Sequence, residues 1–264
     1  MEYKIGEVSK IINISKEMIR YYEKKGVLTP SRVNDNNYRT YSTMDIFLLM
    51  EIVRYQALDY NMNQINDLLS DHYMNKYFTY LDDYYNQLQD EITQKTILSR
   101  RVKELSERAK SSYLNIGNYW IKEIPEHDLF YMLEAHGDDY GKMELNEESK
   151  KILFYERYMP YFESTVIFEK EKETWWYAIQ HDYTRKLLPD LIFEKKLEKQ
   201  YCLCTMIDMG EIGEFNRKLL DPVYQYIQDK GYIINGDPRG MIVCRGYENH
   251  KFQRIIEIQI PIQI

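Results

Sequence analysis

Cysteine is scarce in this chain, and long apolar runs are missing. Three cysteines in 264 residues are an odd number and do not make a disulfide framework. No apolar run reaches the roughly 18 residues of a membrane span, and the stretch 1–4 has no apolar signal core. These absences predict a cytoplasmic protein that does not interact with a membrane.

The short motifs of common enzyme classes are also absent. The chain has no nucleophile elbow, no phosphate-binding loop and no HExxH pair. Its five histidines are scattered, at His72, His127, His136, His181 and His250. We therefore predict no enzymatic activity, no catalytic residues and no cofactor.

Length and charge set broad limits. A chain of 264 residues can hold two domains and a connecting segment. Its formal net charge of −7 weakens non-specific DNA binding, but specific affinity depends on how many cations reach phosphates. The acidic total therefore leaves specific DNA binding open.

Residues 5–41 carry the strongest pattern. Apolar residues recur at helical spacing from Ile5 to Ile12. Ser15 is a good N-cap for a second helix that begins at Lys16, and a glycine lies just past the end of that helix. Two short helices, each with one apolar face, predict a helix-turn-helix whose second helix fits the DNA major groove.

Several short motifs follow one another in a fixed order through this part of the chain. They are Ile5-Gly6-Glu7-Val8, Ile19-Arg20-Tyr21-Tyr22-Glu23, Gly26-Val27-Leu28-Thr29-Pro30, Arg32, Tyr38-Arg39-Thr40-Tyr41 and Ile65-Asn66-Asp67-Leu68-Leu69. Together they resemble the N-terminal winged-helix domain of the MerR family of bacterial transcriptional regulators, and we place this domain at residues 1–72. Asp59 departs from the family pattern, which usually has a glycine at this turn.

The resemblance implies binding to an inverted repeat in double-stranded promoter DNA, together with RNA polymerase. Lys16 and Arg20 are the candidates for base reading, since the planar guanidinium of arginine suits a guanine edge or a phosphate. Packing within the wing is an equal alternative for Tyr38 and Tyr41. The predicted DNA-contacting residues are Lys16, Arg20, Tyr21, Tyr38, Arg39, Tyr41 and Arg54.

Residues 75–112 are polar and contain neither proline nor glycine. Apolar residues step through them by threes and fours, which predicts a coiled-coil helix. The resemblance implies an antiparallel pairing of this helix with a second copy of the chain, and packing within the same chain is the alternative. The predicted seam consists of Leu81, Tyr84, Leu88, Ile92, Leu98, Val102, Leu105 and Ala109.

Residues 117–264 alternate strand-like and helix-like stretches. This order predicts an antiparallel sheet with helices on one side, so the fold class of the whole chain is α+β. We predict strands at 118–124, 128–135, 174–181, 200–208, 241–247 and 253–262, and helices at 146–162 and 213–230.

Three runs in this last segment, Tyr201-Cys202-Leu203-Cys204, residues 222–232 and Ile256-Glu257-Ile258-Gln259-Ile260-Pro261-Ile262, carry a second resemblance. This segment is similar to the effector-binding domain of multidrug-responsive MerR regulators and of the gyrase-inhibitor-like family. The resemblance implies a pocket for a small-molecule effector.

The same segment is rich in tyrosine, tryptophan and methionine, which suit flat, lipophilic and often cationic molecules. For any single ring, core packing is the commoner explanation. Glu134 and Glu257 lie among apolar strand residues, where glutamate is unusual, while the acidic position of the relatives corresponds to Gly240 or Met241. The predicted ligand-binding residues are Tyr131, Glu134, Tyr155, Trp176, Tyr177, Met206, Tyr247 and Glu257.

Two alternatives stay open. Cys202 and Cys204 share a strand face but have no third ligand near them in the sequence, so we interpret them as structural rather than as part of a metal sensor. Slow hydrolysis of a bound electrophile, with a glutamate as the base, is the enzymatic alternative. The reading that we adopt is a ligand-responsive homodimer that activates its promoter by distorting the DNA.

Overall fold

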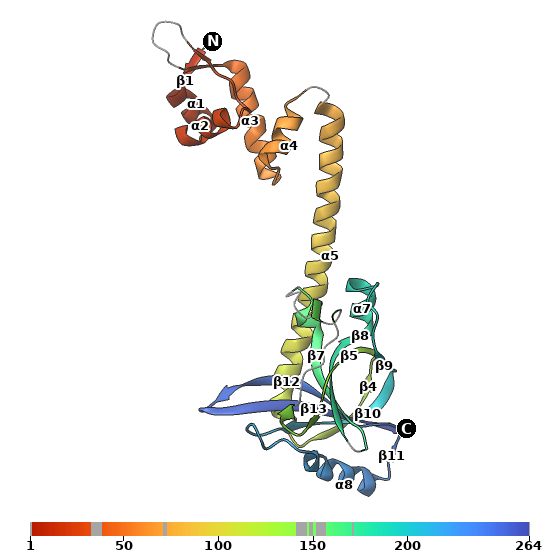
Figure 1. Ribbon diagram of the computed structural model, residues 1–264. Coiled ribbons are helices and arrows are strands. Elements are labelled where there is room, and N and C mark those ends of the chain that lie inside the picture. Colours follow the sequence, from red (N-terminus) through yellow and green to blue (C-terminus); the bar gives the residue numbers. More distant parts are fainter. Residues whose placement is uncertain are drawn as a thin grey trace. The chain divides into compact units, whose positions relative to one another are not determined.

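The computed structural model describes residues 2–32, 39–70, 73–140, 147, 150–151, 157–170 and 172–263 (Figure 1). They form two compact units, Met1–Gln94 and Lys95–Ile264, and the long helix α5 (Tyr73–Leu114) contributes to both. Helices and antiparallel strands occur together, which confirms the predicted α+β class. No helix in the described ranges is both long and apolar enough to cross a membrane.

The first unit is a winged helix-turn-helix. Its three short strands pair antiparallel in the order β1-β3-β2. The helices bury one apolar cluster, in which Val8, Ile19, Leu49 and Ile52 are completely inaccessible to solvent. The elements are β1 (Glu2–Lys4), α1 (Ile5–Ile12), α2 (Lys16–Lys24), β2 (Ser31–Arg32), β3 (Arg39–Ser42), α3 (Thr43–Ala57) and α4 (Met62–Leu68).

Side-chain caps fix where two of these helices begin. Ser15 Oγ accepts the amide N–H of Met18 at 3.1 Å and caps α2, as the sequence predicts. At the start of α3, Ser42 and Asp45 form a reciprocal capping box. These caps satisfy N–H groups that a helix start otherwise leaves unpaired.

Asp59 makes the turn between α3 and α4 in place of the usual glycine. Its φ angle of 59° lies in the left-handed region, which aspartate adopts more readily than most residues other than glycine. The hydroxyl of Tyr84 donates to Asp59 Oδ2 at 3.2 Å. The aspartate therefore gains a contact with α5 that a glycine could not make.

Helix α5 has two different faces within the first unit. On one face, Tyr77, Tyr80 and Tyr84 pack against the apolar cluster of the winged helix. This corrects the prediction for Tyr84, which belongs to an intrachain contact rather than to the exposed side of the helix. The adjoining face exposes between 37% and 61% of five large apolar residues, namely Met74, Phe78, Tyr85, Leu88 and Ile92.

The second unit is built on one large antiparallel sheet. Its strand order is β4-β10-β13-β12-β7-β8-β5-β6, with β9 beside β5 and β11 beside β13. The strands are β4 (Tyr119–Ile124), β5 (His127–His136), β6 (Asp139–Tyr140), β7 (Phe162–Phe168), β8 (Glu173–Gln180), β9 (Lys195–Leu197), β10 (Gln200–Asp208), β11 (Ile233–Ile234), β12 (Arg239–Glu248) and β13 (Lys251–Gln263). The helical elements are η1 (Met159–Tyr161), α7 (His181–Leu187), η2 (Arg217–Leu220), α8 (Asp221–Lys230) and the last turns of α5.

The two faces of this sheet have different chemistry, since successive strand residues point to opposite sides. On one face, Ile256 and Ile258 of β13 pack with Val223 and Ile227 of α8. Helix α8 lies along that side of the sheet in Figure 1. Glu257 and Gln259, which alternate with these isoleucines, are polar and lie on the side of the C-terminal turns of α5. Helices therefore cover both faces, whereas the sequence predicted them on one.

Two predicted helices differ from the structure. The helix predicted at 213–230 begins only at Asp221, because Gly213 has a φ angle of 98° and Pro222 lies in the first turn of α8. The helix predicted at 146–162 falls mainly outside the described residues, and Phe162 begins strand β7. Leu98, predicted for the coiled-coil seam, instead packs beside the cluster around Phe130 within the second unit.

Candidate functional site

The second helix of the helix-turn-helix, α2, exposes the predicted DNA-contacting residues. Lys16 is exposed, and the side chain of Arg20 is 57% exposed, with Glu17 no nearer than 4.0 Å. The ring of Tyr21 is 40% exposed and lies 5.6 Å below the ammonium of Lys25. This face of α2 carries cations that are available to an external phosphate or base.

Tyr41 does not belong to that surface, which corrects the prediction that it contacts DNA. Its side chain is completely buried in the apolar cluster, and its hydroxyl donates to Glu23 Oε1. Arg39 Nε lies 2.8 Å from the other oxygen of Glu23 and stays partly exposed. Glu23 thus ties the wing to α2. Tyr38 lies outside the described residues.

Arg54, near the end of α3, is held in place by neighbours. Its guanidinium lies 5.5 Å from the ring centre of Tyr55 and 5.9 Å from that of Tyr77. It also pairs with Glu51 at 2.5 Å while remaining half exposed. The two rings and the ion pair fix the orientation of this guanidinium.

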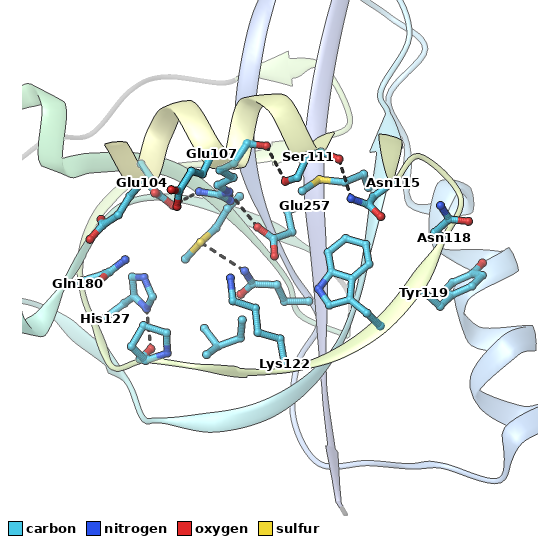
Figure 2. A pocket seen from close by; sticks show the side chains of 18 of the residues that line it. Glu104, Glu107, Ser111, Asn115, Asn118, Tyr119, Lys122, His127, Gln180 and Glu257 are labelled. Carbon is cyan, nitrogen blue, oxygen red and sulfur yellow. Dashed lines mark hydrogen bonds and ion pairs between the residues drawn. The ribbon is translucent and has the colours of Figure 1, made fainter. Parts of the chain in front are cut away.

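The second unit contains a cavity of about 610 Å³ on the polar face of its sheet (Figure 2). Its wall is formed by the last turns of α5 and by strands β4, β5, β7, β8, β10, β12 and β13. The lining residues are Arg101, Glu104, Glu107, Arg108, Ser111, Asn115, Asn118, Tyr119, Trp120, Lys122, Ile124, Pro125, His127, Glu163, Gln180, Met206, Met241, Glu257 and Gln259.

Strand register explains why residues far apart in sequence meet there. Met206 of β10 lies opposite Glu257 of β13, which in turn lies opposite Met241 of β12. Gly240, one residue before, points to the other face. A Cβ atom on it would lie 2.4 Å from Cδ1 of the buried Ile256, so that position has no room for an acidic side chain.

Two arginines of α5 bind two carboxylates of the sheet. Arg101 and Arg108 are two helical turns apart and so lie on the same side of the helix. Glu163 of β7 accepts from Arg101 Nη2 at 2.7 Å and from Arg108 Nη1 at 2.8 Å. The Nε of Arg108 lies 2.9 Å from Glu257 of β13. Both carboxylates of the cavity floor are therefore paired with arginine.

The charged state of this cluster follows from its surroundings. Burial acts to raise the pKa of Glu163, but the guanidinium groups of Arg108 and Arg101 outweigh it and lower the pKa to about 2. Burial lowers the pKa of His127 to about 4. The Nδ1 of His127 lies 2.8 Å from the carbonyl oxygen of Pro125, so the neutral ring donates there and keeps Nε2 as an acceptor.

The remaining wall is mixed. Apolar surface comes from Trp120, Met206 and Met241. Ser111, Asn115, Asn118, Gln180 and Gln259 supply uncharged polar groups, and several of them are visible at the rim in Figure 2. Lys122 is the one lining cation with no carboxylate within 4.0 Å in the part of the chain that the structure describes, whereas Arg101 and Arg108 are both paired.

Of the predicted ligand-binding residues that the structure describes, Met206 and Glu257 line the cavity. Tyr131 and Trp176 pack edge to face in an apolar cluster. Tyr177 packs against two further apolar clusters of the sheet. Ring packing within the sheet therefore replaces the ligand contacts that were predicted for these three residues.

The other predicted ligand residues lie elsewhere. Glu134 is exposed on β5 and pairs with Lys172 at 3.0 Å, so its carboxylate faces solvent instead of an aromatic pocket. Tyr247 is 78% exposed near the end of β12 and contacts Phe252. Tyr155 lies outside the described residues.

Sequence reasoning missed Arg101, Arg108 and Glu163. The available signal was a pair of arginines seven residues apart on the helix, together with a glutamate at the start of an apolar strand. Only the tertiary structure joins these signals, since Glu163 is 55 residues from Arg108.

The cysteines do not form a metal site with other side chains of the described ranges, where no group of three His, Cys, Asp or Glu residues is arranged to hold an ion. Cys202 and Cys204 are completely buried on β10. Burial raises the pKa of both thiols.

Comparison with known proteins agrees with the fold of the first unit. Residues 3–72 match the family model described as MerR HTH family regulatory protein. The heavy metal-dependent transcription regulator 2 of Rhizobium meliloti (strain 1021) is 39% identical over 66 residues, which are 25% of this chain and 45% of the relative. The winged helix-turn-helix of the first unit therefore resembles the DNA-binding domain of this family in both sequence and fold. The chain spans about half the length of the curated relatives that it matches.

Two solved structures match larger shares of the chain at low similarity. The EcmrR–DNA complex in EcmrR-RPo is 19% identical, covers 99% of both chains and has a TM-score of 0.37. A hydrolase from Listeria innocua is 13% identical, covers 60% of this chain and 98% of its own, and has a TM-score of 0.35.

The Glu163 ion pairs predict a loss of stability in acid. A carboxylate whose pKa is depressed in the folded state contributes stability above its unfolded value of 4.5, and this stability is lost as the pH falls toward 2. We expect the free energy of unfolding to drop by about 3 kcal/mol over this window through Glu163. Urea denaturation at a series of pH values would measure it.

Glu163→Gln should remove most of this slope, although it also lowers the stability at neutral pH by leaving both arginines short of a partner. Glu198→Gln changes an exposed carboxylate and should leave the slope unchanged. Equal acid slopes in the wild type and in Glu163→Gln would contradict the assignment.

Proposed function

We propose that this protein is a homodimeric, ligand-responsive transcriptional regulator that binds promoter DNA and has no enzymatic activity. The observation that carries the proposal is helix α2 of the MerR-type domain, which is fixed by a buried core and exposes Lys16, Arg20 and Tyr21 together. A short, rigid helix with exposed cations has the dimensions and charge that the major groove accepts.

The DNA contacts divide into two kinds. Lys16 and Arg20 on α2 read base edges or clamp phosphates, while Arg39 in the wing and Arg54 on α3 grip the backbone. The buried Tyr41 supports Arg39 through their shared partner Glu23. Phosphate contacts of this kind make the affinity fall steeply with salt concentration.

Dimerisation is assigned to the exposed face of α5. Met74, Leu81 and Leu88 are seven residues apart, and so are Phe78 and Tyr85. Two interleaved heptad positions on one exposed face form the seam of a coiled coil, which buries its apolar side chains against a second helix. A second copy of this chain supplies that helix and places two α2 helices on the two halves of an inverted repeat.

The cavity of the second unit is the effector site. Its wall includes Arg101, Arg108 and Ser111 of α5, so a bound lipophilic aromatic molecule would contact the helix that also enters the first unit. A ligand changes the conformational balance only by binding one state more tightly. Activation then follows when the favoured state bends and untwists the promoter for RNA polymerase.

Arg20→Ala should weaken binding to the selected operator by at least about tenfold, since one base or phosphate contact contributes about 1–3 kcal/mol. The operator would be obtained by selection from random duplexes, and affinity measured by fluorescence anisotropy at several salt concentrations. Arg185→Ala serves as the matched control, because it removes an exposed arginine of α7 in the second unit rather than one of α2. An unchanged affinity for Arg20→Ala would exclude α2 as the reading helix.

Leu88→Lys should shift the protein from dimer to monomer at micromolar concentration, because it places a charge in the apolar seam. The matched control is Asn86→Lys, which adds the same charge at an exposed position away from the seam. Sedimentation equilibrium distinguishes the two states. If both variants remain dimers of equal affinity, the dimer interface lies elsewhere.

A further inference from the structure

The carboxylates of the cavity are already neutralised from within the chain. Glu163 uses one oxygen for Arg101 and the other for Arg108. Glu257, on the neighbouring side of the floor, faces the Nε of Arg108 at 2.9 Å. The guanidinium of Arg108 therefore lies between the two carboxylates, in the position that the cation of a bound molecule would otherwise take.

This arrangement is difficult to displace. Both carboxylates are almost completely buried, and the Nε of Arg101 also donates to the carbonyl oxygen of Pro160 at 3.0 Å. Separating one partner of a buried ion pair leaves an uncompensated charge in a medium of low dielectric constant. A ligand cation that had to expel Arg108 would lose on the order of a hundredfold or more in affinity.

The acidic groups nearer the rim are also occupied. Glu104 accepts from the hydroxyl of Tyr183 at 2.8 Å and lies 3.5 Å from Arg101. Glu107 pairs with Lys103 at 3.8 Å. Every lining carboxylate thus has a partner, whereas the lining cation Lys122 has no carboxylate within 4.0 Å among the described residues.

Uncharged groups make up the remaining recognition surface. Trp120 offers a ring, Met206 and Met241 offer polarizable sulfur, and His127 presents a neutral imidazole. Asn115 and Asn118 use their amide NH₂ groups on the carbonyl oxygens of Ser111 and Leu114. Their side-chain oxygens remain as acceptors near the rim (Figure 2).

We propose that Arg108 acts as a built-in counter-cation that makes this cavity specific for uncharged aromatic ligands and excludes lipophilic cations. The inference rests on the proposed effector site and specifies its ligand class. Under this proposal neither Glu134, which faces solvent, nor Glu257, which is paired with Arg108, receives a cationic ligand.

Two probes of similar shape and different charge test the proposal on the full-length wild-type protein. Triphenylphosphine oxide is uncharged and tetraphenylphosphonium is a cation, and isothermal titration calorimetry measures both affinities. We expect the oxide to bind at least tenfold more tightly than the phosphonium. Equal affinities, tighter binding of the phosphonium, or no binding of the oxide would overturn the proposal.

Arg108→Met gives the reciprocal test, because methionine fills much of the same space without the charge. This variant should bind tetraphenylphosphonium at least tenfold more tightly than the wild type, while affinity for the oxide changes less than threefold. Lys110→Met removes one charge from the same helix at an exposed position and should change neither affinity. Absence of a gain in a folded Arg108→Met protein would overturn the proposal.

The double variant Arg108→Met/Glu257→Gln also removes the carboxylate that Arg108→Met leaves unpaired. It contains no unpaired buried charge at Glu257, so it tests the role of this carboxylate in a protein that is less prone to misfold. It should lose the gained affinity for the phosphonium and keep that for the oxide. If it binds the phosphonium as tightly as Arg108→Met, Glu257 is not the exposed partner and the proposal fails. The operator-binding experiment with Arg20→Ala is independent, so failure of this inference is distinguishable from failure of the proposed DNA-binding function.

Discussion

The ion pairs between Arg108, Glu163 and Glu257 are the constraint on which the second unit depends. They place charged groups on the interior face of a sheet whose other face is apolar, and they join that face to α5. Buried charges persist only when they are paired. The cavity is therefore a polar space in which arginines of α5 neutralise the carboxylates of the sheet. The helix and the sheet both supply the charged groups of its wall.

Helix α5 has different tasks along its length. In the first unit, Tyr77 and Tyr84 attach it to the winged helix, and Leu88 lies on the exposed face. In the second unit, Arg101 and Arg108 attach it to the sheet. A repeat of three and four residues describes all these positions equally well. Only the tertiary structure determines which of them meet the same chain.

Local signals in the sequence were sufficient for much of the fold. The cap at Ser15 and the ordered motifs predicted the helix-turn-helix, and alternation of apolar residues predicted six strands of the sheet. The site was harder to predict. Tyr41 and Trp176 are residue types that often contact DNA or ligands, but here they pack in the core. Glu163 and Arg108 are far apart in the sequence and become an ion pair only when the chain folds. The amino-acid composition of a segment indicates which ligands its side chains are able to bind. Whether those side chains are accessible depends on their burial in the folded protein.

The close packing at Gly240 has an evolutionary consequence. No side chain fits there because Ile256 already occupies the space, so the sheet cannot gain an acidic group at that residue without rebuilding its core. Position 108 of the helix is different, since a single substitution there would uncover a carboxylate that already exists. In the proposed effector site, the charge of the ligand that fits is therefore open to change through the helix, while the sheet stays the same.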